Sequence, residues 1–206
     1  MALTPEPEYQ PVLRAPAATV WLIAILAAAH LARTLAPADM ADQIILNYGF
    51  TPSCYSGGDL CQTLFEKIVP FVSYMFLHAD FVHLGINCVW LLAFGSIVTR
   101  RLGAALFFAL FFICGVAGAA THLALNWGSA IPTIGASAAI SGLMGVAFRL
   151  ITLEPWRPGQ PSIAPLFSQR ILVWSAIWVG VNVLAGVTGL GAGVEVRLIA
   201  WQAHLG

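Results

Sequence analysis

Charge is the scarcest property of this chain. Only 9% of its 206 residues are charged, with nine basic and nine acidic side chains, and Lys67 is the one lysine. The sequence has no basic block and no net charge, which argues against nucleic acid as a partner. Hydrophobic residues make up 59% of it, well above the share in a soluble domain. The composition therefore predicts an integral membrane protein whose partners lie in the lipid bilayer.

Cysteines and repeats are also scarce. Cys88 and Cys114 lie in apolar runs, whereas Cys54 and Cys61 share one polar loop. Four such cysteines do not form a disulfide scaffold, and only the pair in the loop could be bonded, so a disulfide and two free thiols both stay open. No internal repeat is visible and the membrane segments lack charge, which argues against a transporter or channel.

Six segments approach the length needed to span a membrane, which is about 20 mostly apolar residues. They are predicted to be helices because lipid cannot satisfy an open sheet edge. The segments are 15–36, 81–98, 103–125, 135–153, 171–190 and 196–206. The last would cross only about half a bilayer, so we expect the natural protein to continue. The predicted fold is an all-α polytopic membrane protein, a six-helix bundle whose sixth helix is truncated.

The basic residues predict an orientation. With residues 1–14 as an uncleaved cytoplasmic tail, most arginines lie on the inner side, as the positive-inside rule requires. The inner set is Arg14, Arg100, Arg101, Arg149, Arg157 and Arg170, against Arg33, Lys67 and Arg197 outside. The loop 37–77 is then external, and its amphipathic piece "LFEKIVPFVSYMF" is expected to lie partly in the membrane interface. Arg33 is expected to snorkel outward.

Two polar side chains are predicted to meet near the outer side of the membrane. Ser137 opens the fourth segment, and His204 lies at a matching depth in the sixth. Serine needs a base to take its proton, and histidine does this near neutral pH. Because the five complete segments contain no Asp or Glu and Lys67 is in the external loop, the sequence favours a Ser-His dyad without a carboxylate.

Donors for a developing oxyanion are also present. His83 and Asn87 are four residues apart and share one helix face. Ser137 follows "PTIG", which ends at Gly135, so its backbone N–H lies at a helix start and has no helical partner. His78 lies in the turn before His83.

Two other interpretations were weighed. Ser137, Ser141 and Gly145 form a small-residue stripe typical of helix packing. For Ser141 and Gly145 we prefer that interpretation, whereas the match with His204 favours chemistry for Ser137. A metal site of His78, His83 and His204 lacks a carboxylate or thiolate at a suitable spacing, and we do not favour it.

Three stretches together resemble the rhomboid intramembrane serine proteases. They are "FLHADFVHLGINCVWLLAFG", "GASAAISGLMG" and "AWQAHLG", in that family's order, and the resemblance runs from Phe71 to the C-terminus. It implies Ser137 as nucleophile, His204 as general base, and His83 with Asn87 as oxyanion donors. His78, Gly135 and Trp90 would be supporting residues, Trp90 as the aromatic that follows the asparagine.

The same resemblance implies the surroundings of the reaction. The substrates would be single-span membrane proteins whose helix unwinds near its outer end, and no cofactor is implied. The location would be a bacterial plasma membrane, with the active site opening to the outer side.

Two positions depart from the family's pattern. Ala138 stands where glycine usually follows the nucleophile, and Ser141 stands where an aromatic often packs beneath the histidine. These departures keep an alternative open, a rhomboid-like pseudoprotease that binds membrane helices without cutting them.

Overall fold

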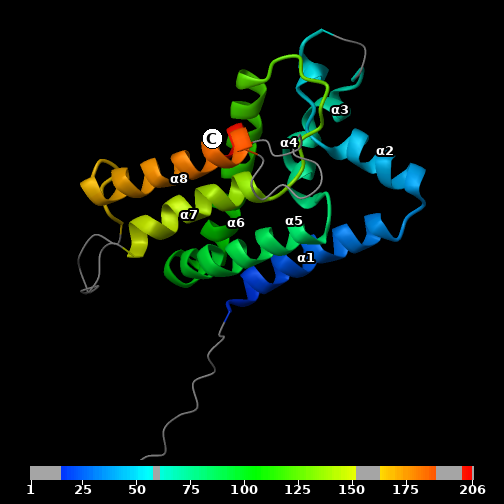
Figure 1. Ribbon diagram of the computed structural model, residues 1–206. Coiled ribbons are helices and arrows are strands. Elements are labelled where there is room, and N and C mark those ends of the chain that lie inside the picture. Colours follow the sequence, from blue (N-terminus) through cyan, green and yellow to red (C-terminus); the bar gives the residue numbers. More distant parts are fainter. Residues whose placement is uncertain (1–14, 58–60, 152–162, 189–200, 206) are drawn as a thin grey trace, which may run out of the picture.

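The computed structural model describes residues 15–57, 61–151, 163–188 and 201–205, and the described chain is almost entirely helical (Figure 1). The α-helices are α1 Ala17–Thr34, α2 Ala38–Tyr48, α3 Leu64–Ile68, α4 Pro70–Ser73, α5 Phe81–Trp90, α6 Ser96–Leu125, α7 Ser137–Ile151 and α8 Gln169–Thr188. A π-helical turn, Leu91–Gly95, joins α5 to α6. Short 3-10 helices cover Pro52–Tyr55, Tyr74–Phe76 and Trp201–Leu205.

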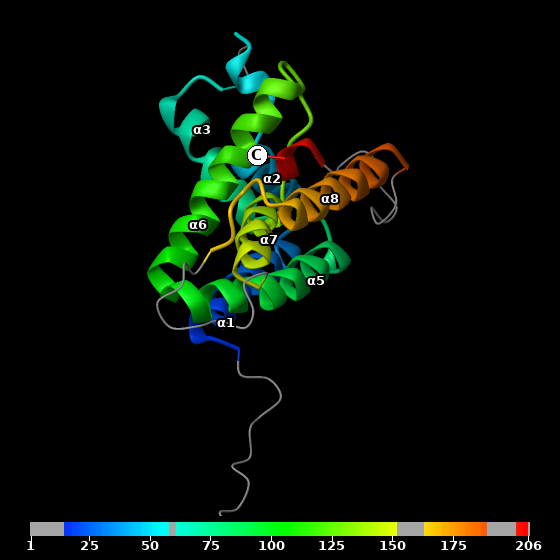
Figure 2. The same ribbon diagram turned by 90° about the vertical axis from the view of Figure 1, so that its left-hand side faces the viewer.

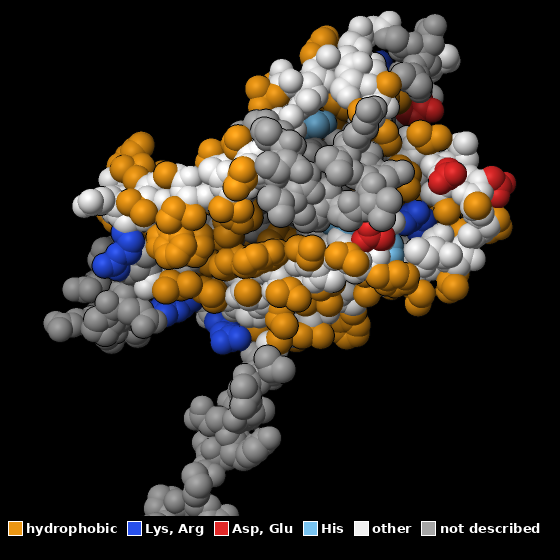
Figure 3. Space-filling model, viewed as in Figure 1, with side chains coloured by type: hydrophobic (Ala, Val, Ile, Leu, Met, Phe, Trp, Pro, Cys, Tyr) orange, Lys and Arg blue, Asp and Glu red, His pale blue; other side chains and the backbone are white. Residues whose placement is uncertain are grey.

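Two helical stretches of the described residues are long and apolar enough to cross a membrane. They are Ala17–Thr34 and Phe81–Leu125, and shorter apolar helices cover Ser137–Ile151 and Gln169–Leu184. Hydrophobic side chains cover much of the face in Figure 3, between one end where basic side chains gather and another where acidic ones lie. Exposed apolar side chains occur on several helices, such as Trp21 on α1, Val89 on α5 and Ile177 on α8. An apolar surface of this extent is expected where a protein faces lipid.

The break between the second and third predicted segments lies slightly later than expected. Helical backbone continues through Arg100 and Arg101, and the chain turns at Gly103. The φ of Gly103 is 85°, a value that is incompatible with an α-helix. A positive φ is accessible to glycine at little cost, so the chain can reverse there. The fourth helix likewise begins at Ser137 rather than at residue 135.

Helix α7 occupies the middle of the bundle. It contacts α5, α6, α8 and the 3-10 helix Trp201–Leu205, and Figures 1 and 2 show it between α6 and α8. Its buried side chains join a core that α1 and α6 complete, with Leu26, Phe107, Phe111 and Leu143 fully buried. The start of α7 is thereby fixed from several sides.

The predicted loop 37–77 is a set of short helices at one end of the molecule (Figure 1). Thr63 and Glu66 form a capping box that starts α3, and Cys54 is bonded to Cys61. The disulfide is one of the two states that the sequence left open. Several large apolar side chains of this region are exposed, including Met40, Leu46 and Phe65.

Candidate active site

The chain segment that precedes Ser137 is held by backbone hydrogen bonds. Thr133 exchanges two bonds with Phe50, of 2.9 and 2.8 Å, in the isolated bridge of the described residues. The N–H of Gly135 then donates to the carbonyl of Tyr74 at 2.9 Å. The Thr133 hydroxyl also bonds His122 Nε2 at 2.9 Å, which ties the segment to α6. These bonds fix the segment that leads to Ser137, the first residue of α7.

Gly135 allows this segment to pass close to His83. Its φ is 124°, and a Cβ built there would lie 2.9 Å from the His83 ring and 3.7 Å from Ser137 Oγ. A side chain at this position would therefore be strained and would collide with the imidazole. The geometry puts the His83 ring and the Ser137 hydroxyl on the same side of Gly135.

Ser137 and His204 are brought together. His204 Nε2 lies 2.7 Å from Ser137 Oγ, within hydrogen-bond distance. The 3-10 helix that carries His204 packs closely on α6, because a Cβ at Gly118 would lie 2.7 Å from the carbonyl oxygen of Ala203. The same hypothetical Cβ would lie 2.6 Å from the Ala138 methyl. Gly118 thus lets both the serine helix and the histidine helix approach α6.

Ala138 fits an ordinary helix. The described residues include no non-glycine residue with positive φ, and the Ala138 side chain is 3% exposed against Gly118. Its methyl group therefore points into the contact between α6 and α7. The departure from glycine does not distort the turn that presents Ser137.

A third polar residue contacts the pair, and sequence reasoning missed it. His204 Nδ1 is hydrogen-bonded to Asn182 Oδ1, and Asn182 Nδ2 donates to the carbonyl of Trp178 at 2.8 Å. Asn182 is the one amide in the interior of α8, whose other amide, Gln169, is the first residue of the helix. A polar group inside a membrane helix usually has a specific partner. An amide in the middle of an apolar helix was therefore the sequence signal for this contact.

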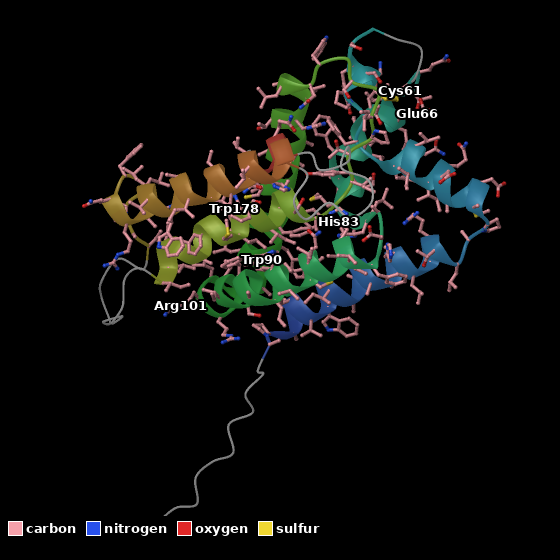
Figure 4. All side chains as sticks on the ribbon, viewed as in Figure 1. Cys61, Glu66, His83, Trp90, Arg101 and Trp178 are labelled. Carbon is pink, nitrogen blue, oxygen red and sulfur yellow. A yellow bond between two sulfur atoms is a disulfide. The ribbon has the colours of Figure 1, made fainter. Side chains whose placement is uncertain are left out.

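The His83 ring has a defined hydrogen-bonding direction. Its Nδ1 accepts from the backbone N–H of Ala79 at 3.4 Å, and because a backbone N–H can only donate, the neutral ring carries its proton on Nε2. The backbone of His83 is in turn fixed by the Asp80 carboxylate, which accepts its N–H at 2.7 Å and caps α5. In Figure 4, His83 and Trp178 lie on different sides of the start of α7.

Asn87 lies one turn after His83 and is buried. Its Nδ2 donates to the carbonyl of His83 at 2.8 Å, while its Oδ1 has no hydrogen-bond partner in the described structure. An amide nitrogen carries two hydrogens, so one donor of Asn87 stays available.

His78 is fully buried behind this pair. Its ring meets the His83 ring edge to face with centroids 5.1 Å apart, and neither ring nitrogen has a partner among the described residues. Arg33 donates to the carbonyls of His78 and Ala79, both at 2.9 Å. The expectation that Arg33 snorkels outward was therefore wrong, because these carbonyls give its guanidinium a partner inside the protein.

The structure also shows the surroundings of Trp90 and of the small-residue stripe on α7. Trp90 stacks on Phe94 with centroids 5.4 Å apart, and in Figure 4 it lies further along α5, toward the end that carries Arg101. The packing stripe was assigned to the wrong residues: nothing lies within 4 Å of a Cβ at Gly145, whereas a Cβ at Gly142 would lie 2.3 Å from Cys114 Sγ.

Ser141 forms a hydrogen bond that neither supports nor contradicts its expected packing role. Its hydroxyl donates to the carbonyl of Ser137 at 2.8 Å, so it is satisfied within its own helix. A metal centre finds no support in the parts of the chain that the structure describes, where no group of three His, Cys, Asp or Glu side chains is arranged to hold an ion.

The comparison with protein families gives one match. The family profile of the rhomboid domain matches residues 66–206, which includes every residue of the candidate site. No curated protein matches the chain.

Proposed function

Because the chain belongs to the rhomboid family of integral membrane proteins, we propose that it is an intramembrane serine endopeptidase with Ser137 as nucleophile and His204 as general base. The observation that carries this proposal is the 2.7 Å hydrogen bond between Ser137 Oγ and His204 Nε2. A hydroxyl is a weak nucleophile until a base within such a distance takes its proton.

The first half of the reaction forms an acyl-enzyme. His204 Nε2 takes the proton of Ser137 as its Oγ attacks the carbonyl carbon of the scissile peptide bond. The resulting oxyanion accepts hydrogen bonds from His83 Nε2–H, the free N–H of Asn87 and the backbone N–H of Ser137. The His204 imidazolium then protonates the leaving nitrogen, and the C–N bond breaks.

Water completes the reaction by the same groups. His204 takes a proton from the water as its oxygen attacks the ester carbonyl, the same donors stabilise the second oxyanion, and the proton returns to Ser137 Oγ as the acid product leaves. No step needs a metal or a cofactor, because the proton is only exchanged between serine, histidine, water and substrate.

The substrate class follows from the surroundings of Ser137. The hydroxyl lies at the first turn of an apolar helix in a membrane domain, so the peptide bond it attacks must also enter the membrane. We propose single-span membrane proteins whose helix unwinds near its outer end, since a regular helix hides its carbonyl carbons from a nucleophile. Arg100 and Arg101 near the start of α6 and Arg170 near the start of α8 favour a cytoplasmic location for these helix ends and an outward-facing site.

A cleavage assay tests the proposal. The purified protein in detergent would be incubated with a single-span model substrate that carries a glycine-rich segment near its outer end, beside a leucine-only version of the same helix. We expect the wild type to cut the first substrate faster than the second, and Ser137→Ala to cut neither. Binding of the substrate by both proteins without any cleavage would instead identify a pseudoprotease.

A further inference from the structure

The histidine of a Ser-His pair has two ring nitrogens, and the second one needs its own partner. For His204 Nε2 to accept the serine proton, the neutral ring must carry its hydrogen on Nδ1. In an apolar setting an N–H without an acceptor is unfavourable, and the ring is then free to adopt the opposite tautomer or to rotate. The acceptor of Nδ1–H therefore decides whether Nε2 faces the serine as a base.

Asn182 supplies that acceptor, and its orientation is fixed. The Trp178 carbonyl can only accept, so the amide atom 2.8 Å from it must be Nδ2. The other amide atom, bonded to His204 Nδ1, must then be the oxygen, which can only accept. Two hydrogen bonds thus assign the tautomer of His204 without reference to the serine.

The position of Asn182 on α8 points to the same role. The side chain is 6% exposed, whereas its neighbours Val181 and Val183 are 53% and 37% exposed. Asn182 is therefore the residue that α8 turns inward at this level, toward the histidine helix. Its amide carries no charge, so it can orient an imidazole inside a membrane domain without the desolvation cost of a carboxylate.

We propose that Asn182 is the positioning residue of a Ser137–His204–Asn182 triad, holding the imidazole in the tautomer and orientation that activate the serine. This inference rests on the proposed protease function. It assigns the place that a carboxylate has in soluble serine proteases to an amide on α8. It also offers a support for the imidazole at a site where Ser141, whose hydroxyl is bonded to its own helix, supplies no aromatic ring.

Three variants separate orientation from packing. Asn182→Leu keeps a side chain of similar size without an acceptor, Asn182→Ala removes both, and Asn182→Asp keeps the acceptor oxygen. Asn126→Leu is the matched control, because Asn126 also bonds a histidine ring, His122 Nδ1 at 3.2 Å, and a helix carbonyl. Each variant would be assayed for kcat and KM on one model substrate, for the rate of fluorophosphonate labelling of Ser137, and for thermal unfolding in detergent.

We expect kcat to fall in the variants that lack a hydrogen-bond acceptor at position 182 and to recover in the variant that keeps one. We expect Asn182→Leu and Asn182→Ala to lower kcat and the labelling rate by about 10- to 100-fold with KM within about threefold, and Asn182→Asp to restore most of both. Asn126→Leu should leave kcat within about threefold of wild type even if it lowers the unfolding temperature.

Several outcomes would overturn the inference. An unchanged kcat in Asn182→Leu, or a loss in all three Asn182 variants that follows their unfolding temperatures, would show that Asn182 serves packing alone. A wild type that binds but does not cleave would overturn the proposed function, and the triad with it. If the wild type cleaves the substrate and Asn182→Leu is equally active, the triad inference fails while the proposed protease function stands.

Discussion

Ser137 Oγ and His204 Nε2 are 2.7 Å apart although 67 positions separate the two residues in the chain. The contact joins the start of α7 to the 3-10 helix Trp201–Leu205, and both elements approach α6 at Gly118. Chemistry at this site therefore depends on how closely three helical elements pack.

Asn87 is expected to act on the transition state rather than on substrate binding. Asn87→Ala should lower kcat by about 10- to 1000-fold with little change in KM, because an oxyanion donor is used only after attack has begun. Asn87→Asp, which is the same size but offers no N–H donor, should lose as much. Steady-state kinetics on one model substrate measure both, and an unchanged kcat in either variant would remove Asn87 from the oxyanion site.

Gly135 is expected to be intolerant of any side chain. Gly135→Ala should lower kcat at least about 10-fold, because its methyl would strain a backbone with φ of 124° and displace the His83 ring. Gly145→Ala is the matched control, since nothing lies within 4 Å of a Cβ there. It should keep full activity and gain about 0.5–1 kcal/mol of stability from its helical position. Equal activity of both variants would contradict the close approach at Gly135.

Ala138→Gly should change stability more than activity. The substitution removes a buried methyl group and a good helix former, which together cost about 1–2 kcal/mol. Because Ala138 already has helical backbone and its methyl faces Gly118, kcat/KM should stay within about threefold. A clear rise in kcat/KM would show that the methyl group obstructs the substrate instead.

The Asp80 carboxylate is expected to stabilise α5. Asp80→Ala removes the side chain that accepts the His83 N–H and should lower the free energy of unfolding by about 0.5–2 kcal/mol. Asp80→Asn retains an N-cap oxygen and should unfold close to the wild-type temperature. Thermal unfolding in detergent compares the three proteins, and equal loss in both variants would mean that the cap bond does not matter.

Much of the arrangement was predictable because the motifs are local. The length of the apolar segments and their lack of charge predicted the apolar helices, and the spacing of His83 and Asn87 put them on one helix face. The meeting of Ser137 with His204 could be argued from their matching depth and from the family resemblance, but not from local spacing. The structure adds the packing at Gly118 that makes the contact possible.

The features that the sequence did not predict depend on which face of a helix contacts its neighbours. A stripe of Ser141 and Gly145 looks like a packing face, but α6 meets the neighbouring face at Ala138 and Gly142. Arg33 turned inward because the carbonyls of His78 and Ala79, far away in sequence, were within its reach. Asn182 is a further case, since one amide in an apolar helix does not reveal its partner before the helices are packed.

Covalent labelling of the serine tests the central claim most directly. The purified protein would be treated with a fluorophosphonate probe, and the modified residue would be identified by mass spectrometry in wild type, Ser137→Ala and His204→Ala. If Ser137 and His204 form the catalytic pair, we expect a single adduct on Ser137 in the wild type and none in Ser137→Ala. Labelling should be slowed by at least about 100-fold in His204→Ala, because the base is lost. Labelling of another serine, or equally fast labelling of Ser137 without His204, would contradict this pairing.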